Sequence, residues 1–121
     1  MQTVEVHPVG VHHVAVNVAD VAESVAFYTG ALGLTLRADR PDIGVDGAWL
    51  DAGAQQVHFV QAPVPRNLGQ HFALEVEDLD AAVAELRARG VAVSDPSGVG
   101  AARQAFLVDP SGNPVELHQR R

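Results

Sequence analysis

The 121-residue sequence contains no cysteine and no lysine. Without cysteine the chain cannot form disulfides, thiolate nucleophiles or zinc sites built on sulfur. Without lysine it cannot form a Schiff base with a substrate or the phosphate-binding P-loop motif. The groups left for chemistry are six histidines, the carboxylates and the amides.

Positive charge is also scarce. Eight arginines stand against 15 acidic residues, the formal net charge is -7, and the arginines are scattered along the sequence. Because nucleic-acid binding requires clustered positive charge, we expect no nucleic-acid partner. No stretch approaches the roughly 18 uncharged apolar residues of a membrane span, and the start lacks the pattern of a signal peptide. We therefore expect a cytoplasmic protein with no membrane partner.

The sequence has enough apolar residues to fold, and it repeats itself. A hydrophobic content of 47% with 19% charged residues is typical of a packed chain, so we expect one domain over residues 1–121. The segment HVAVNVADV at 13–21 corresponds to HFALEVEDL at 71–79, an offset of 58 residues. We interpret the domain as two modules joined by a linker with two prolines. The modules span 10–62 and 69–120, and the linker spans 63–68.

Each module is predicted to fold as βαβββ. Alternating apolar and polar residues at the start of each module are typical of a strand with one buried face. Asp20, and either Asp78 or Asp80, precede helical patterns that stop at Gly30 and Gly90. The fold class is therefore α+β, with the helix of each module on the apolar face of its strands. Three further strands are expected in each module, at about 34–38, 45–52 and 56–61 and at about 91–94, 102–108 and 114–119.

The face opposite the helices carries side chains that can bind a metal. His13 and His71 begin equivalent strands, and His58 and Glu116 occupy equivalent positions on the last strand of each module. All four are side-chain types that bind divalent metals. Duplication of a packing residue explains the two equivalent histidines equally well, but it does not explain a carboxylate, which is costly to bury without a partner. At this point a metal site and a copied packing position are both open.

Three more residues near these positions have two interpretations each. His118 lies on the same face as Glu116. It is either a residue that supports Glu116 or carries protons, or a residue exposed to solvent. His12 precedes His13 and is expected at the surface rather than among the ligands. Trp49, the single tryptophan, either forms a wall of the site or caps the core.

The residue patterns resemble those of the vicinal oxygen chelate superfamily. The resemblance lies in two copies of His-x-Ala-x-x-Val-x-Asp, in AFYTGALGL at 26–34 and in DPSGNPVEL at 109–117. This superfamily includes glyoxalase I, methylmalonyl-CoA epimerase, extradiol dioxygenases, fosfomycin-resistance transferases and bleomycin-binding proteins. The resemblance implies that the paired modules form a curved mixed sheet, shaped as a cup, whose concave face holds a divalent metal such as Fe, Mn, Ni or Zn.

The resemblance also implies roles for individual residues. It places metal ligands at His13, His71 and Glu116, with His58 as a fourth ligand or a general base. His58 stands where glyoxalase I enzymes typically carry glutamate, and this departure counts against simple glyoxalase I activity. The fosfomycin transferases use a lysine, which this chain lacks, and Ala15 stands where they have threonine.

The expected substrate contacts come from four other residues. Arg103 and Gln104, on the strand beside Glu116, are expected to contact an anionic or carbonyl part of a substrate. Asn17 and Trp49 are candidates for the wall of the cup. The expected function is that of a metal-dependent enzyme that chelates a small oxygenated substrate, as a glyoxalase-like lyase or isomerase or an extradiol-type dioxygenase. The alternative is a protein that binds or sequesters a small molecule or antibiotic without catalysis. A homodimer is expected, because two small modules leave sheet edges uncovered.

Overall fold

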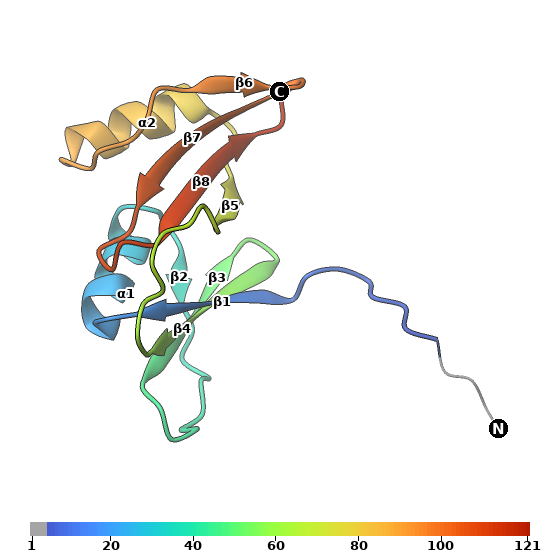
Figure 1. Cartoon of the computed structure of the whole chain (residues 1–121), viewed down its shortest axis with the longest axis vertical. Helices are drawn as coiled ribbons and strands as arrows, with labels where there is room; N and C mark the ends of the chain where they lie inside the picture. Colours follow the sequence, from blue (N-terminus) through green and yellow to red (C-terminus); the bar gives the residue numbers. More distant parts are fainter. Residues whose placement is uncertain (1–4) are drawn as a thin grey trace.

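The computed structural model describes residues 5–121, which form two modules of the same fold (Figure 1). Each module is a four-stranded mixed sheet with one helix. The strand order is β1-β4-β3-β2 in the first module and β5-β8-β7-β6 in the second, and the first and last strands of each module run parallel. These features confirm the α+β class with two βαβββ modules. No helix within residues 5–121 is long and apolar enough to cross a membrane.

The bounds of the elements follow the chain order. The first module contains β1 (His13–Val18), α1 (Val21–Gly30), β2 (Thr35–Leu36), β3 (Gly47–Ala52) and β4 (Gln55–Gln61). The second module contains β5 (Phe72–Glu75), α2 (Leu79–Ala88), β6 (Ser97–Val99), β7 (Ala102–Val108) and β8 (Pro114–Gln119). The last two strands coincide with the predicted segments 102–108 and 114–119.

Both helices begin at an aspartate that caps the first turn. The Asp20 carboxylate accepts a hydrogen bond from the Glu23 amide at 2.9 Å, and the Asp78 carboxylate accepts one from the Ala81 amide at 3.0 Å. These bonds satisfy amides that have no partner inside the helix. Of the two starts considered for the second helix, Asp78 is therefore the correct one. Gly90 follows α2 with φ at +84°, a conformation that favours glycine over other residues.

One predicted strand is wrong in position. A strand was expected at 91–94, but β6 spans Ser97–Val99. Val93 is buried, and its carbonyl accepts a hydrogen bond from the Arg87 guanidinium of α2 at 2.8 Å. The apolar alternation at 91–93 therefore reflects packing beside the end of α2, and the segment bonds to β7 at Ser94, whose amide donates to the Phe106 carbonyl at 2.9 Å. The strand expected at 34–38 is also shorter than predicted, since β2 contains two residues.

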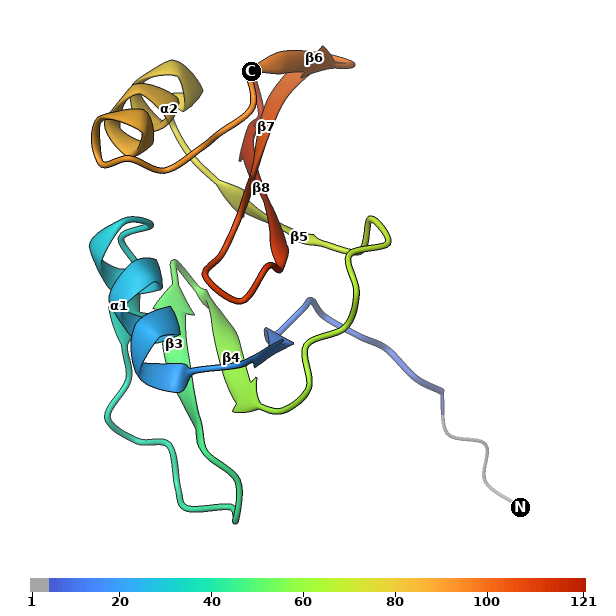
Figure 2. The ribbon, with the colours of Figure 1, turned by 60° about the vertical axis from the view of Figure 1, so that its left-hand side comes forward.

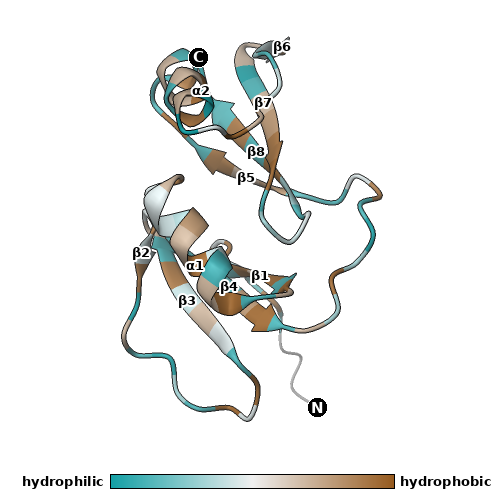
Figure 3. Cartoon of the chain, turned by 90° about the vertical axis from the view of Figure 1, so that its left-hand side faces the viewer, coloured by the Kyte–Doolittle hydropathy of each residue, from teal (hydrophilic) through white to brown (hydrophobic). Residues whose placement is uncertain are grey.

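The core lies between each helix and the face of the sheet that it covers. Leu50 and Val57 are at most 2% exposed in the first module, as are Val115 and Leu117 in the second. The banding along the strands in Figure 3 follows the same alternation. We call the side of each sheet that faces away from its helix the open face. By strand register it carries Ala15, Trp49 and His58 in the first module and Ala73, Phe106 and Glu116 in the second.

The two sheets are separate within the described residues. β1 pairs only with β4 and β5 pairs only with β8, so each leaves one edge without a hydrogen-bonded neighbour in residues 5–121. The modules touch instead through the β7–β8 turn, which reaches the first module in Figure 2. There Tyr28 Oη donates to Asp109 Oδ2 at 2.7 Å, and the Ala19 amide donates to Ser111 Oγ at 3.0 Å. Side-chain hydrogen bonds, rather than a shared sheet, therefore join the modules. We call the two bonds at this turn, Tyr28 with Asp109 and Ala19 with Ser111, the clasp.

Candidate metal centre

The first pair of candidate ligands lies on the open face of the first module. The parallel register of β1 and β4 sets Ala15 beside His58, and the antiparallel register of β3 sets Trp49 on its other side. The His58 ring is stacked between two others: its centroid is 3.9 Å from that of His13 and 4.6 Å from that of Trp49. We call His13 and His58 the module-one pair. Trp49 thus forms part of the wall around this pair rather than a cap on the core.

Burial and nearby charge keep His58 of the module-one pair in the form that can bind a metal. The Nδ1 atoms of His12 and His13 lie 2.9 Å apart, so at least one of them carries no proton. His58 Nε2 lies 2.8 Å from Gln56 Oε1. Burial, and then the positive charge of His13, lowers the pKa of His58 below its ordinary value. His58 therefore stays neutral, as a ligand or a base must, to a lower pH than a solvated histidine.

The second pair lies on the open face of the second module. His71 immediately precedes β5, and the parallel register sets Ala73 beside Glu116 on β8. His71 Nε2 is 3.1 Å from Glu116 Oε1, and His71 Nδ1 is 2.9 Å from the Gly69 carbonyl oxygen. A backbone acceptor at Nδ1 holds the ring with Nε2 toward the carboxylate, as is usual for metal-binding histidines. We call His71 and Glu116 the module-two pair.

A third histidine completes the surroundings of Glu116. The Glu116 side chain is 10% exposed, and its second carboxylate oxygen lies 2.7 Å from His118 Nδ1. Both carboxylate oxygens of Glu116 are therefore held by histidines. This contact favours the supporting role over the solvent-exposed one for His118. The hydrogen bond to the Gly69 carbonyl is the main cause that raises the pKa of His71. Glu116 raises this pKa further, whereas burial lowers it.

The two pairs do not combine into one site in a single chain. Within residues 5–121, no three histidine or acidic side chains are grouped so that they could hold a metal ion. A catalytic metal usually has three or more protein ligands, so neither pair suffices alone. Taken together, three imidazoles and one carboxylate form a donor set that suits Fe, Mn, Ni or Zn. The residues thus fit a divalent metal only if the two pairs are brought together.

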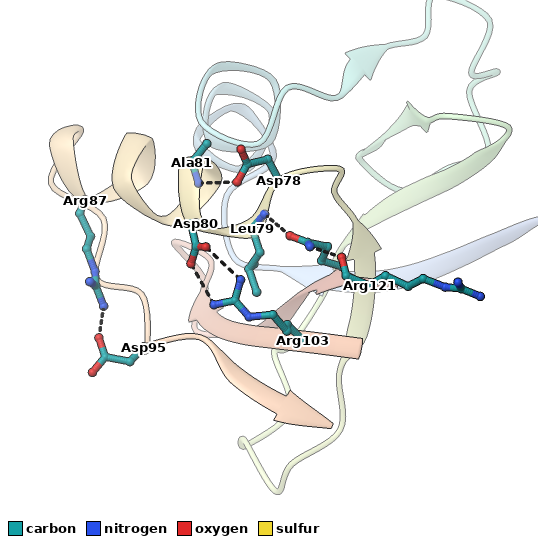
Figure 4. Close-up of polar contacts among 9 residues, drawn as sticks. Asp78, Leu79, Asp80, Ala81, Arg87, Asp95, Arg103 and Arg121 are labelled. Carbon is teal, nitrogen blue, oxygen red and sulfur yellow. Dashed lines mark hydrogen bonds and ion pairs between the residues drawn. The ribbon is translucent and has the colours of Figure 1, made fainter. Parts of the chain in front are cut away.

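Arg103 lies away from the expected site. It shares a side of β7 with Ala105 and Leu107, which are buried under the helix. Its guanidinium binds both carboxylate oxygens of Asp80 on α2, at 2.9 and 3.0 Å (Figure 4). Gln104, by contrast, is the cross-strand neighbour of His118 and lies on the open face. Of the two residues expected to contact a substrate from this strand, Gln104 lies on the open face and Arg103 lies on the helix side.

Asn17 has a structural role that the sequence did not indicate. The side-chain amide of Asn17 donates to the Pro63 main-chain carbonyl at 3.0 Å. The main-chain carbonyl of Asn17 accepts a hydrogen bond from Asn113 Nδ2 at 2.9 Å. It also lines a hollow of about 360 Å³ between β1 and β5, of which His71 forms another part. Asn17 therefore holds the linker and the turn at the edge of a hollow that reaches the module-two pair.

Two residues near the module-one pair were missed at the sequence level. Gln56 lies two positions before His58 on β4, and alternation alone could have placed it on the open face. Arg40 lies in the loop between β2 and β3, where no periodic pattern points to a face. Its charge is one of those that lower the pKa of His58.

Comparison with known proteins agrees with this architecture. The model of the Glyoxalase/Bleomycin resistance protein/Dioxygenase superfamily matches residues 10–117. The uncharacterized protein YaeR of Escherichia coli is 32% identical, over 91% of this chain and 95% of that protein. A lactoylglutathione lyase of Arabidopsis thaliana is also 32% identical, over 89% of this chain, which spans 43% of the plant protein.

Solved structures show the same fold. A glyoxalase family protein from Enterococcus faecalis has a TM-score of 0.72 and 29% identity, covering 91% of this chain and 97% of its own. TnmS3, an antibiotic binding protein from a Streptomyces species, has a TM-score of 0.78 and 28% identity, covering 95% of this chain and 98% of its own. The similar proteins thus include both a lyase and a binding protein.

Proposed function

Because the chain belongs to the Glyoxalase/Bleomycin resistance protein/Dioxygenase superfamily, we propose that it is a metal-dependent enzyme acting on a small oxygenated substrate. The substrate would bind the metal through two neighbouring oxygen atoms, in a lyase or isomerase reaction or an extradiol-type dioxygenation. The observation that carries this proposal is the pair of ligand sets at equivalent positions on the open faces. Each set has a histidine at the start of the module's first strand and a second donor on its last strand.

The proposed metal site takes one pair from each of two copies. His13 and His58 of one chain would meet His71 and Glu116 of the partner subunit. Two facts support this arrangement: the pairs stay apart within residues 5–121, and β1 and β5 each have an edge without a strand partner there. Unpaired edges favour association with another chain. A homodimer with two shared sites follows from the twofold symmetry of such an assembly.

Each residue of the site has a defined part in this proposal. The metal, when bound, supplies Lewis acidity that stabilises negative charge on the substrate oxygens. His71 is oriented by the Gly69 carbonyl, and Glu116 is held by His118. His58, whose pKa is lowered, serves as a ligand or accepts a proton from the substrate. Gln104 is placed to hydrogen bond with a carbonyl group.

Metal content of the purified protein tests the proposal. Elemental analysis should find about one divalent metal per chain in the wild type. Glu116→Ala should lower this content severalfold, because it removes the single carboxylate ligand. His12→Ala is the matched control, since His12 is exposed and lies beside the site without belonging to it. Equal metal content in the two variants would contradict the assignment.

Turnover then separates catalysis from binding. Oxygen uptake with catechols would indicate dioxygenase chemistry, and loss of methylglyoxal thiol adducts would indicate lyase chemistry. The second candidate function, binding of a small molecule or antibiotic without reaction, is favoured by the similarity to TnmS3 over 95% of the chain. A metal-free protein that binds such compounds without changing them would support the second function over the first.

A further inference from the structure

The side chain of Gln56 determines which nitrogen of His58 carries a proton. Gln56 and His58 lie two positions apart on β4, so their side chains project from the same side of the strand. His58 Nε2 lies 2.8 Å from Gln56 Oε1, an amide oxygen, which can accept a hydrogen bond but cannot donate one. The neutral ring of His58 must therefore carry its proton on Nε2.

The other ring nitrogen, His58 Nδ1, is left free. It has no hydrogen-bond partner within residues 5–121. The buried side-chain atoms there that lack a partner are Ser24 Oγ and Arg40 Nε, so His58 Nδ1 retains contact with solvent. A neutral imidazole with its proton on Nε2 has its lone pair on Nδ1. Nδ1 is thus the atom with which His58 can bind a metal or accept a proton.

The aromatic neighbours of His58 fix the plane of its ring but do not select a nitrogen. The rings of His13 and Trp49 stack on it, with interplanar angles of 13° and 14°. A half turn of the imidazole within this stack would keep the plane and would place a carbon atom, instead of Nε2, beside Gln56. The hydrogen bond to Gln56 would then be lost, which is costly for a buried polar group. Gln56 is therefore the contact that selects one orientation of the ring.

The second module holds its histidine by the opposite nitrogen. His71 Nδ1 lies 2.9 Å from the Gly69 carbonyl oxygen, and His71 Nε2 is turned to Glu116. There the acceptor belongs to the main chain, whereas at His58 it belongs to a side chain. A substitution can therefore remove the acceptor of His58 and leave the backbone unchanged.

We propose that Gln56 is a positioning residue that keeps the proton of His58 on Nε2 and so presents Nδ1 to the metal or the substrate. An acceptor at the second nitrogen is usual for metal-binding histidines, and it orients the ring and selects its protonated form. The inference names the atom through which His58 acts in the site proposed above, and in this respect it rests on that proposed function.

Nitrogen-15 NMR of the metal-free protein tests the proton position directly. The chain has six histidines, and the signals of His58 are those that disappear in His58→Asn. At about pH 8 a solvated imidazole is neutral. Under these conditions His58 of the wild type should carry its proton on Nε2, and the hydrogen bond to Gln56 should slow exchange of that proton with water.

Substitutions of Gln56 test whether this residue is the cause. Gln56→Leu should lose the slow exchange and show a mixture of the two protonated forms of His58, whereas Gln56→Glu retains an acceptor and should keep the wild-type form. Gln55→Leu is the matched control, because Gln55 is the same residue type one position earlier on β4 and is exposed. It should leave the His58 signals unchanged.

Titration with Zn²⁺ then connects the proton position to metal binding. In the wild type, Zn²⁺ should displace the Nδ1 signal of His58 and leave the proton on Nε2. Gln56→Leu should bind Zn²⁺ about tenfold or more weakly, as is typical when the acceptor behind a metal-binding histidine is removed. Gln56→Glu should bind it at least as tightly as the wild type, and Gln55→Leu should match the wild type.

The outcomes separate this inference from the proposed function. A proton on Nδ1 in the wild type would overturn the inference, and this measurement does not depend on any variant being folded. A Gln56→Leu variant that is folded by circular dichroism and keeps the wild-type signals of His58 would also overturn it, as would displacement of the Nε2 signal by Zn²⁺. If the proton is on Nε2 and depends on Gln56, but Zn²⁺ moves neither nitrogen, the role of Gln56 stands and the proposed metal site fails.

Discussion

Two histidines of the candidate site respond oppositely to their surroundings. The Gly69 carbonyl and Glu116 raise the pKa of His71, whereas burial and neighbouring positive charge lower the pKa of His58. A metal binds only the neutral imidazole, so protons compete with it first at His71 and last at His58. The acid limit of metal binding should therefore be set by the module-two pair.

The expected pH dependence follows from these directions. Metal affinity should fall as the pH drops through the raised pKa of His71, and by more than about tenfold per pH unit once two histidine ligands titrate. In the metal-free protein, the raised pKa of His71 adds stability that is fully present below about 6.5 and is lost as the pH rises through the folded pKa. The melting temperatures of the metal-loaded and chelator-treated proteins should therefore converge from pH 8 to pH 5. Curves that coincide at every pH would show that the histidines hold no metal.

Among the elements, the β7–β8 turn both connects two strands and bonds the second module to the first. Asp109 Oδ2 accepts from Tyr28 Oη at 2.7 Å, and Asp109 Oδ1 accepts from the amides of Ser111 and Asn113. Burial, and then the charge of Asp109, raises the pKa of Tyr28, so the phenol remains a donor. These hydrogen bonds hold the turn in one conformation and connect the second module to α1.

Removing the Tyr28 hydroxyl should weaken this clasp. Tyr28→Phe should lower the free energy of unfolding by about 1–3 kcal/mol, because it leaves a buried carboxylate with fewer donors. Ser24→Ala on the same helix is the control: Ser24 Oγ is buried without a partner in the described residues, so its loss should change stability by less than about 0.5 kcal/mol. Denaturant unfolding measures both, and equal losses would contradict the role of the clasp.

The sequence predicts these elements well where alternation and capping act locally. It places β7 and β8 at their observed bounds and puts Glu116 on the face away from Val115 and Leu117. It fails at 91–94, because a segment packed beside a helix can show the same apolar alternation as a strand. Arg103 lies on the helix side and binds Asp80, a position that alternation with Ala105 and Leu107 already indicated. Arg40 could not be found, since only the folded loop brings its guanidinium to Gly47.

At the scale of the whole molecule, residues 5–121 carry two candidate half-sites, and the strands β1 and β5 that lead to them each have one edge without a strand partner. The two half-sites follow from the repeat, which gives each module the same candidate ligand positions, but one chain does not bring the pairs together within residues 5–121. The sequence alone could not show this, because the relative position of the modules depends on contacts between distant segments, such as Tyr28 with Asp109, 81 residues apart, and Arg89 with Gly30, 59 residues apart. The proposed function therefore depends on a second copy of the chain.

Subunit mixing tests this dependence most directly. A His13→Ala, His58→Ala double variant and a His71→Ala, Glu116→Ala double variant should each bind almost no metal, provided that circular dichroism shows both to be folded and light scattering shows dimers. After mixing and exchange, metal content should recover to about a quarter of the wild-type value, because about half of the dimers are mixed and each keeps one of two sites. If the mixture binds no more metal than its separate components, the metal site is not shared between two chains and the central claim is wrong.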